Sequence, residues 1–177
     1  MDKAQSELYG NVERLAEQET TNPKLLDING EPIDPEWAAL FAGFFWGEGT
    51  MIIDSIHNGK TYNPYCQVWL RADDGGILGE FASKLGGRLR DHPNPTGGGN
   101  PQRIWKISKI VDCHRIARLL ETTAALPFRK RRELPIWREA IELKLANLYS
   151  KTDNDHYLQE MSRLKKQLSR QKVYEAL

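Results

Sequence analysis

The fold is decided by the stretch DPEWAALFAGFFWGEG, residues 34–49. Asp34 is suited to cap the free backbone N–H groups of a helix, and the proline and glutamate after it are favoured in a first helical turn. Residues 37–46 are almost wholly apolar, which predicts a helix buried on most of its sides. The helix is expected to end at the Gly-Glu-Gly triplet 47–49.

Small residues recur at every fourth position of this helix, at Ala39, Gly43 and Gly47. Residues four apart share one helical face, and a face without side chains lets a second helix approach backbone to backbone. Glycine inside a helix costs about 1 kcal/mol relative to alanine, so two of them indicate a close contact. The sequence leaves open whether the contact is made by another helix of the same chain or by a second copy.

Hydrophobic patterning beyond this helix predicts two strand pairs, each followed by a helix. The predicted elements are residues 50–57, 64–71, 73–85, 88–92, 102–108, 111–123 and 131–150. The dipeptide Asn58-Gly59 is a strong hairpin signal between the first two strands. The predicted fold class is therefore α+β, an αββαββα core with a four-stranded antiparallel sheet and extra helices at its carboxyl end.

The ends of the chain differ from this core in composition. Residues 1–33 form an acidic, weakly patterned extension, and residues 34–150 form the predicted core. Residues 151–177 have an apolar stripe at helical spacing, which predicts a helix packed on the body or on a partner. The stripe consists of Leu158, Met161, Leu164 and Leu168.

Composition narrows the class of protein. Basic residues cluster between positions 103 and 132, which suits a phosphate backbone but also an ordinary solvated face. Cys66 and Cys113 are too few and too far apart to predict a zinc site or a disulfide framework. The amino terminus has no apolar core, and no apolar run approaches the roughly 20 residues that cross a bilayer. We therefore expect a soluble, intracellular protein without membrane contact.

Residues 41–49, FAGFFWGEG, resemble the LAGLIDADG motif of homing endonucleases. The predicted element order over residues 34–145 is similar to the core of that family, and the basic run PFRKRRE at 127–133 is similar to the start of the family's late helix. The resemblance implies a site-specific DNA endonuclease. Because the chain holds one motif, it also implies a homodimer in which the small-residue helices pair about a two-fold axis.

The resemblance further implies a metal-dependent site at the base of the paired helices. Glu48 fills the position of one motif acid, and the backbone carbonyl of Gly47 joins it in the implied ligand set. Magnesium suits such a site, because it is held by one or two carboxylates together with phosphate oxygens and waters. Trp46 stands where the family often has a second acid.

Basic side chains are implied around the same site. Either Lys130 or Arg132 matches the family's lysine at the start of the late helix, and the sequence leaves open which of the two points inward. Arg71, at the end of the second predicted strand, is the other catalytic candidate. Leu70 stands at a position that can hold glutamine in relatives. The basic run is alternatively a solvated segment or a targeting signal.

Alternation along the strands predicts which side chains share the outer face of the sheet. The residues expected to contact DNA there are Thr50, Asp54, Tyr65, Gln67, Arg88, Arg90, His92 and Lys106. Trp69 and Ile104 are expected on the same face, whereas Leu89 is expected in the core. Arginine can grip guanine edges and glutamine can grip adenine. The resemblance implies that this sheet lies in the major groove, with two copies spanning a long pseudo-palindromic site.

Two other functions are compatible with the same residues. A non-cleaving relative, either a maturase that binds intron RNA or a regulator that binds DNA, keeps the two-glycine helix and loses the cleavage site. A purely structural dimer accounts for the tail but not for the basic outer face. Metal-dependent cutting of DNA separates the first from an endonuclease, and salt-dependent DNA affinity excludes the second.

Overall fold

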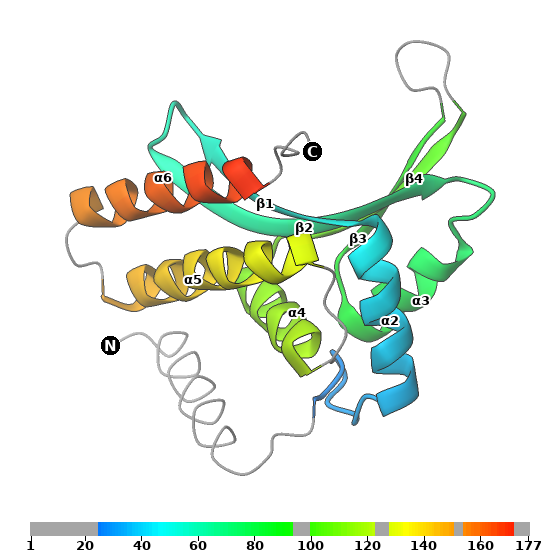
Figure 1. The fold of residues 1–177 in the computed structure, drawn as a ribbon. Coiled ribbons are helices and arrows are strands. Elements are labelled where there is room, and N and C mark those ends of the chain that lie inside the picture. The colour runs from blue at the N-terminus through cyan, green and yellow to red at the C-terminus, as the bar shows by residue number, and fades with distance from the viewer. Residues whose placement is uncertain (1–24, 94–99, 123–127, 151–153, 172–177) are drawn as a thin grey trace, which may run out of the picture.

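The computed structural model describes residues 25–93, 100–122, 128–150 and 154–171. Its elements are α2 (Pro35–Glu48), β1 (Gly49–Ile56), β2 (Thr61–Arg71), α3 (Gly76–Leu85), β3 (Arg88–His92), β4 (Gln102–Ile107), α4 (Ile110–Thr122), α5 (Phe128–Ser150) and α6 (Asn154–Gln171) (Figure 1). The α+β class and the αββαββα order are thus confirmed. Most of the acidic extension, residues 1–24, and the end of the predicted tail helix, residues 172–177, lie outside the described residues.

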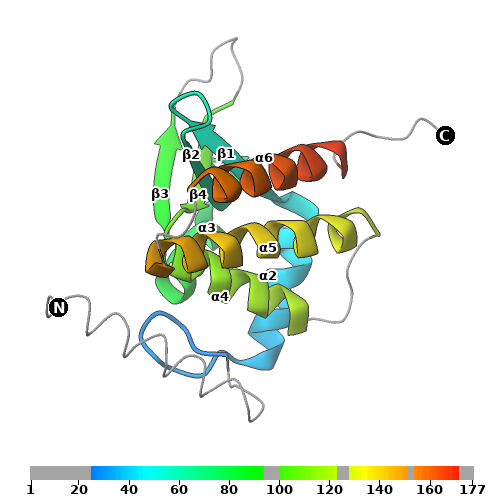
Figure 2. The ribbon, with the colours of Figure 1, turned by 90° about the vertical axis from the view of Figure 1, so that its left-hand side faces the viewer.

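The four strands form one antiparallel sheet in the order β1-β2-β4-β3. Helices cover one face of this sheet, and the opposite face is left open (Figure 1). The covered face supplies alternate residues of β1, β2 and β4 to a single core, among them Met51, Cys66, Val68, Trp105 and Ile107. On the helical side, α5 lies between α6 and α4 (Figure 2).

Helix α2 begins as the sequence predicts. One side-chain oxygen of Asp34 accepts hydrogen bonds from the backbone N–H groups of Glu36 and Trp37, each at 2.9 Å. Its apolar side is then fixed by rings: Phe41 meets Phe81 edge-to-face with the ring centroids 5.0 Å apart. Such aromatic pairs contribute about 0.5–1.5 kcal/mol beyond the area they bury. These contacts fix the orientation of α2 and therefore the position of its last residues.

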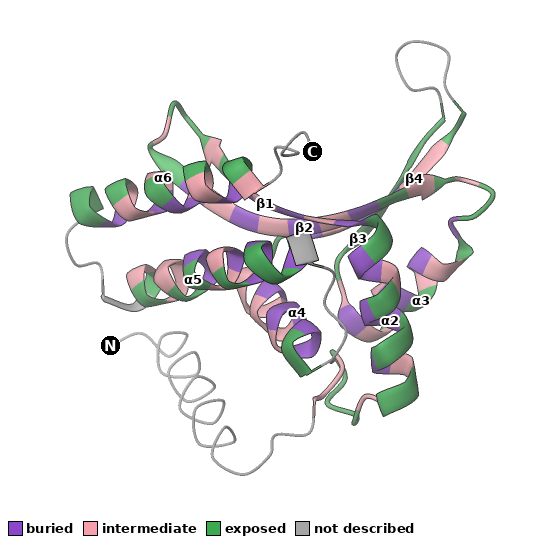
Figure 3. Cartoon of the chain, in the orientation of Figure 1, coloured by how far each residue is buried: buried purple, intermediate pink, exposed green. Residues whose placement is uncertain are grey.

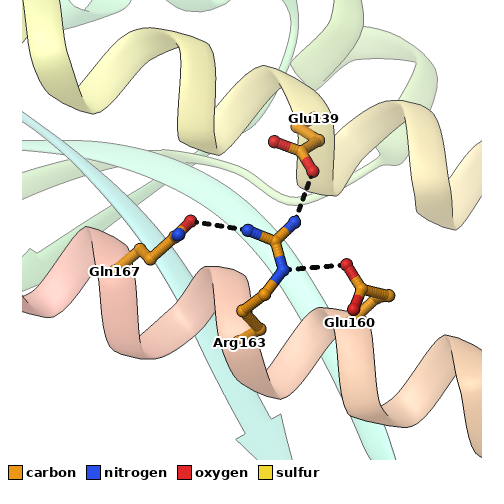
Figure 4. A network of polar contacts seen from close by, with 4 residues as sticks. All are labelled: Glu139, Glu160, Arg163 and Gln167. Carbon is orange, nitrogen blue, oxygen red and sulfur yellow. Dashed lines mark hydrogen bonds and ion pairs between the residues drawn. The ribbon is translucent and has the colours of Figure 1, made fainter.

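Helix α6 belongs to the same core. All four residues of its predicted apolar stripe contribute to the hydrophobic cluster, and three of them are fully part of the buried core. Tyr157 of the same helix is buried as well. Arg163 anchors the outer side, donating to Glu139 of α5 at 2.6 Å, to Glu160 at 2.8 Å and to Gln167 at 3.0 Å (Figure 4). The predicted packing of this helix on the body of the protein is confirmed.

Truncation of this stripe therefore has a measurable effect on stability. We expect Leu164→Ala to lower the free energy of unfolding by about 2–5 kcal/mol, because Leu164 is fully buried and its removal leaves a cavity. Leu148→Ala is the matched control, since Leu148 is 56% exposed; we expect a change within about 0.5 kcal/mol. Urea unfolding measures the free energy of unfolding of both variants. Equal changes in the two variants would show that α6 unfolds separately from the core.

Some sequence expectations differ from the structure. Leu89 faces the helical side as predicted but is 41% exposed, because β3 is an edge strand that is exposed along its whole length (Figure 3). Helix α3 begins at Gly76, after a turn, and α5 begins three residues before its predicted start. Cys66 and Cys113 are free and buried. No helix among the described residues is long and apolar enough to cross a membrane.

Candidate metal site and nucleic-acid interface

Glu48 is the last residue of α2, where the chain passes directly into β1. The following residue, Gly49, caps the helix by donating its N–H to the Phe45 carbonyl. A Cβ on Gly49 would lie 2.5 Å from the Phe45 ring, so this abrupt passage requires glycine. The side chain of Glu48 is exposed, and the last turn of α2 has no basic residue. A carboxylate at the negative end of a helix dipole attracts a cation.

The donor atoms at this end of α2 fit a hard divalent cation. Glu48 offers carboxylate oxygens and the exposed Gly47 offers a backbone carbonyl, both of which are oxygen donors of the kind magnesium prefers. In the part of the chain that the structure describes, no three His, Cys, Asp or Glu side chains gather at one point. The described residues of one protomer therefore offer at most part of a coordination shell.

Lys130 is the basic residue that the structure brings to this junction. It lies in the first turn of α5, is 3% exposed, and donates a hydrogen bond from Nζ to the carbonyl of Gly49, the neighbour of Glu48. Its ammonium group also lies 5.8 Å from the centroid of the Phe45 ring. A contact between residues so far apart in sequence fixes the start of α5 against the passage from α2 to β1.

The other two basic candidates lie elsewhere. Arg132 is exposed, and at about 100° per residue it points to the opposite side of α5 from Lys130. Arg71 forms an ion pair with Asp73 at 2.7 Å in which both side chains are largely exposed. Its strand has left β1 by that point, because the β1–β2 pairing ends at Val68. The structure therefore groups Lys130, and neither arginine, with the residues that flank Glu48.

The structure adds a finding for Trp46, and it adds Glu133, which the sequence analysis did not single out. Trp46 stands at the position of the family's second acid, and its indole is buried in the core with no hydrogen-bond partner for Nε1 among the described residues. Glu133 is fully buried one helical turn after Lys130. Its position three residues after a buried lysine in α5 is the only signal that could have marked it beforehand.

The open face of the sheet carries all eight residues predicted to face DNA. Register places four of them in one row across the strands: Thr50 opposite Gln67, Gln67 opposite Lys106, and Lys106 opposite Arg88. A second row has Trp69, Ile104 and Arg90, and a third has Arg71, Gln102 and His92. Tyr65 and Asp54 extend the face along β2 and β1.

Side chains on this face support one another. The Lys106 ammonium lies 3.6 Å from the centroid of the Tyr65 ring, and the rings of Trp69 and His92 are 5.6 Å apart. Burial, together with the charge of Asp54, raises the pKa of Tyr65 above its ordinary value, so its hydroxyl stays a hydrogen-bond donor. A shallow groove of about 300 Å³ runs between them, lined by Gln67, Trp69, Arg88, Arg90, His92, Ile104, Lys106 and Ser108.

Three cations on this face have no acidic partner among the described residues. Among the described residues, Arg88, Arg90 and Lys106 form no ion pair, whereas Arg103 on the helical side is paired with Asp91 at 2.6 Å. Cations that lack acidic partners are available to phosphate oxygens and base edges. The face therefore has the charge and the hydrogen-bonding groups needed to bind nucleic acid.

The small-residue face of α2 is uncovered. Ala39, Gly43 and Gly47 are exposed, and Leu40 beside them is 53% exposed. A Cβ built on Gly43 or Gly47 meets no atom within 4 Å. No described part of this chain packs against these glycines, so a contact within the described chain does not account for them.

Comparison with known proteins finds solved structures with a similar fold. No protein-family model matches the chain, and no curated protein matches its sequence. The archaeal intron-encoded homing endonuclease I-Vdi141I, complexed with DNA, gives a TM-score of 0.61 at 15% identity over 80% of this chain and 87% of that chain.

Two further solved structures agree. The group I intron-encoded homing endonuclease I-CeuI, complexed with DNA, gives a TM-score of 0.63 at 16% identity over 77% of this chain and 67% of that one. The LAGLIDADG homing endonuclease I-GzeII, in complex with its DNA target, gives 0.59 at 18% identity over 72% of this chain and 43% of that one. The chain has the fold of the LAGLIDADG homing endonucleases, as its motif implied.

Proposed function

We propose that the protein is a site-specific DNA endonuclease that acts as a homodimer and uses Mg²⁺ to cut both strands of a long, pseudo-palindromic site. One observation carries the proposal: the exposed Glu48 carboxylate ends an uncovered small-residue helix and directly precedes a sheet whose open face has unpaired cations. The likeness to homing endonucleases solved with DNA supports it.

Two copies complete the site. Pairing of the α2 faces through Ala39, Gly43 and Gly47 brings the two Glu48 side chains together at the same end of the helices. It also places two open sheets side by side. The fold of this chain corresponds to 43% of the I-GzeII chain, which leaves room in that protein for a second unit of similar size. A dimer of this chain matches such an arrangement.

The open faces then read the DNA. In the proposed complex the sheet faces the major groove, where arginine pairs with guanine edges and glutamine with adenine, each good pair contributing about 1–3 kcal/mol of discrimination. Arg88, Arg90 and Gln67 are placed for such contacts, and Lys106 for a guanine edge or a phosphate. Thr50, Asp54, Tyr65 and His92 supply further donors and acceptors on the same face.

Phosphodiester hydrolysis needs an activated water and relief of the charge that develops on the phosphate oxygens. Mg²⁺, when bound, supplies both. Within the chain, Glu48 and the Gly47 carbonyl hold the cation at the end of α2. Lys130 donates a hydrogen bond to the carbonyl of Gly49, the residue after Glu48. Its positive charge there stabilises the negative charge that develops on the phosphate oxygens. The two-fold axis provides one such set for each strand.

Selection of cleaved molecules from a randomised DNA library tests the proposal. We expect recovery of one long, approximately two-fold symmetric site in the presence of Mg²⁺ and none in the presence of EDTA. The burial of Trp46 in place of a second acid favours the alternative, a non-cleaving binder of DNA or RNA. Specific binding without cleavage under all metal conditions would establish that alternative and refute the endonuclease.

The two basic residues of α5 are distinguished by substitution. We expect Lys130→Met to lower the single-turnover cleavage rate constant by about a hundredfold, the effect of removing one preorganised charge near the reacting phosphate. Arg132→Gln is the matched control on the same helix, and because Arg132 points away it is expected to alter the rate little. DNA affinity in Ca²⁺ and unfolding in urea are measured in parallel, because Lys130 is also buried. A larger rate loss in Arg132→Gln would reverse the assignment.

A further inference from the structure

An apolar pair lies within the polar open face of the sheet. Trp69 of β2 and Ile104 of β4 are directly opposite in the register, and Arg90 of β3 lies opposite Ile104 on its other side. Trp69 is 41% exposed, while Ile104 is 6% exposed because its neighbours cover it. Both line the groove on the face that is not packed by helices. Neither belongs to the main hydrophobic cluster.

The surroundings indicate what this pair contacts. Arg88, Arg90, Lys106 and His92 line the same groove, and they suit a polyanionic partner. An exposed indole on this face loses its contact with water favourably when it meets an apolar group of the partner. In the major groove of DNA, the base edges present one apolar group, the C5-methyl of thymine.

We propose that Trp69 and Ile104 form a contact for a thymine methyl group, so that the protein prefers thymine at the base pair facing them. The inference rests on the proposed binding of DNA by the open face. It adds which base the row of Trp69, Ile104 and Arg90 recognises. Trp69 provides the exposed apolar surface, and the tilted stack with His92, with the ring centroids 5.6 Å apart, holds its indole in place. Ile104 fills the floor of the groove beneath.

The register also fixes where this thymine lies. The Trp69 row is displaced by two residues along the strands from the row that contains Gln67, Lys106 and Arg88. Two residues of a strand span about 6.6–6.8 Å, which is about two base steps of 3.4 Å in B-DNA. With the strands running along the DNA axis in the proposed complex, the thymine lies about two base pairs from the position whose identity depends on Gln67.

Replacement of thymine by uracil tests the contact, because it removes the methyl group alone. The probe is the DNA site selected from the library, with single thymines replaced in each half-site and affinity measured by fluorescence anisotropy in Ca²⁺. We expect one thymine per half-site at which uracil weakens binding about fourfold, the effect of one methyl-sized group returned to water. Trp69→Ala is expected to bind the thymine and uracil sites equally.

The position and the control are both decisive. The sensitive thymine should lie about two base pairs from the position at which Gln67→Ala relaxes the base preference. Leu89→Ala is the matched control: Leu89 is also 41% exposed but lies on the helical side of the sheet, so its variant should keep the uracil effect. Equal affinity of the unmodified protein for thymine and uracil at every position, with cleavage intact, would overturn the inference and leave the proposed function standing. Failure to recover any specific site would overturn both.

Discussion

Glu48→Gln is expected to lower the Mg²⁺-dependent cleavage rate constant by about a thousandfold or more while specific DNA binding is retained. Glutamine has almost the same shape as glutamate but no charge, so it removes the anionic ligand and leaves the helix end and the sheet unchanged. A metal contributes several kcal/mol of charge stabilisation to such a reaction, and each 1.36 kcal/mol corresponds to a factor of ten in rate. Single-turnover cleavage of the selected site measures the loss, and anisotropy in Ca²⁺ measures binding.

Glu36→Gln is the matched control for this experiment. Glu36 is an exposed glutamate of the same helix, but it lies in the first turn, at the end opposite Glu48. Its replacement removes the same charge from α2, so an effect shared by both variants would reflect the net charge of the protein. Cleavage by Glu48→Gln at the rate of the unmodified protein would remove Glu48 from the metal site.

Gly43→Leu is expected to convert the proposed dimer into folded monomers and thereby abolish double-strand cleavage. Within one protomer the substituted side chain has room, because a Cβ at Gly43 meets no atom within 4 Å. In the proposed dimer it enters a close helix contact, and overpacking of this kind costs about 1–3 kcal/mol at each site. Both copies carry the substitution in a two-fold contact, so the cost arises twice. The affinity of the dimer should therefore fall about a hundredfold or more. Sedimentation equilibrium measures the change.

Gly79→Leu provides the comparison for this variant. Gly79 is a helical glycine of α3 at which a Cβ would also meet no atom within 4 Å, but it lies outside α2. We expect this variant to remain dimeric and to keep its cleavage activity. A dimer that persists in Gly43→Leu would show that the open face of α2 is not the contact between copies.

Local sequence patterns predicted much of the fold because short-range geometry controls it. The Asp34 cap and the extent of α2 follow from the residues themselves, and alternation along β2 assigned Tyr65, Gln67 and Trp69 to the open face. The same alternation failed to predict the burial of Leu89, because burial depends on which helices cover the end of the sheet. An edge strand and a central strand can have the same pattern.

Only the tertiary structure decided between the two basic residues of α5. Lys130 and Arg132 are equivalent in the sequence, and the contact of Lys130 with the Gly49 carbonyl depends on how α5 packs beside the passage from α2 to β1. The openness of Gly43 likewise depends on which described residues pack beside it, because a Cβ there would meet no atom within 4 Å, and the sequence left this undecided. The row that aligns Trp69 with Ile104 depends on strand order and register.

The sequence by itself therefore determined the kinds of elements, their order and the end of the helix that carries Glu48. These features depend on backbone geometry and on hydrophobic periodicity within a few residues. The tertiary structure determined which side chains meet across the fold, such as Lys130 with Gly49 and Trp69 with Ile104. Contacts of this kind require the whole core to pack, because the residues that form them are brought together only when the helices cover one face of the sheet.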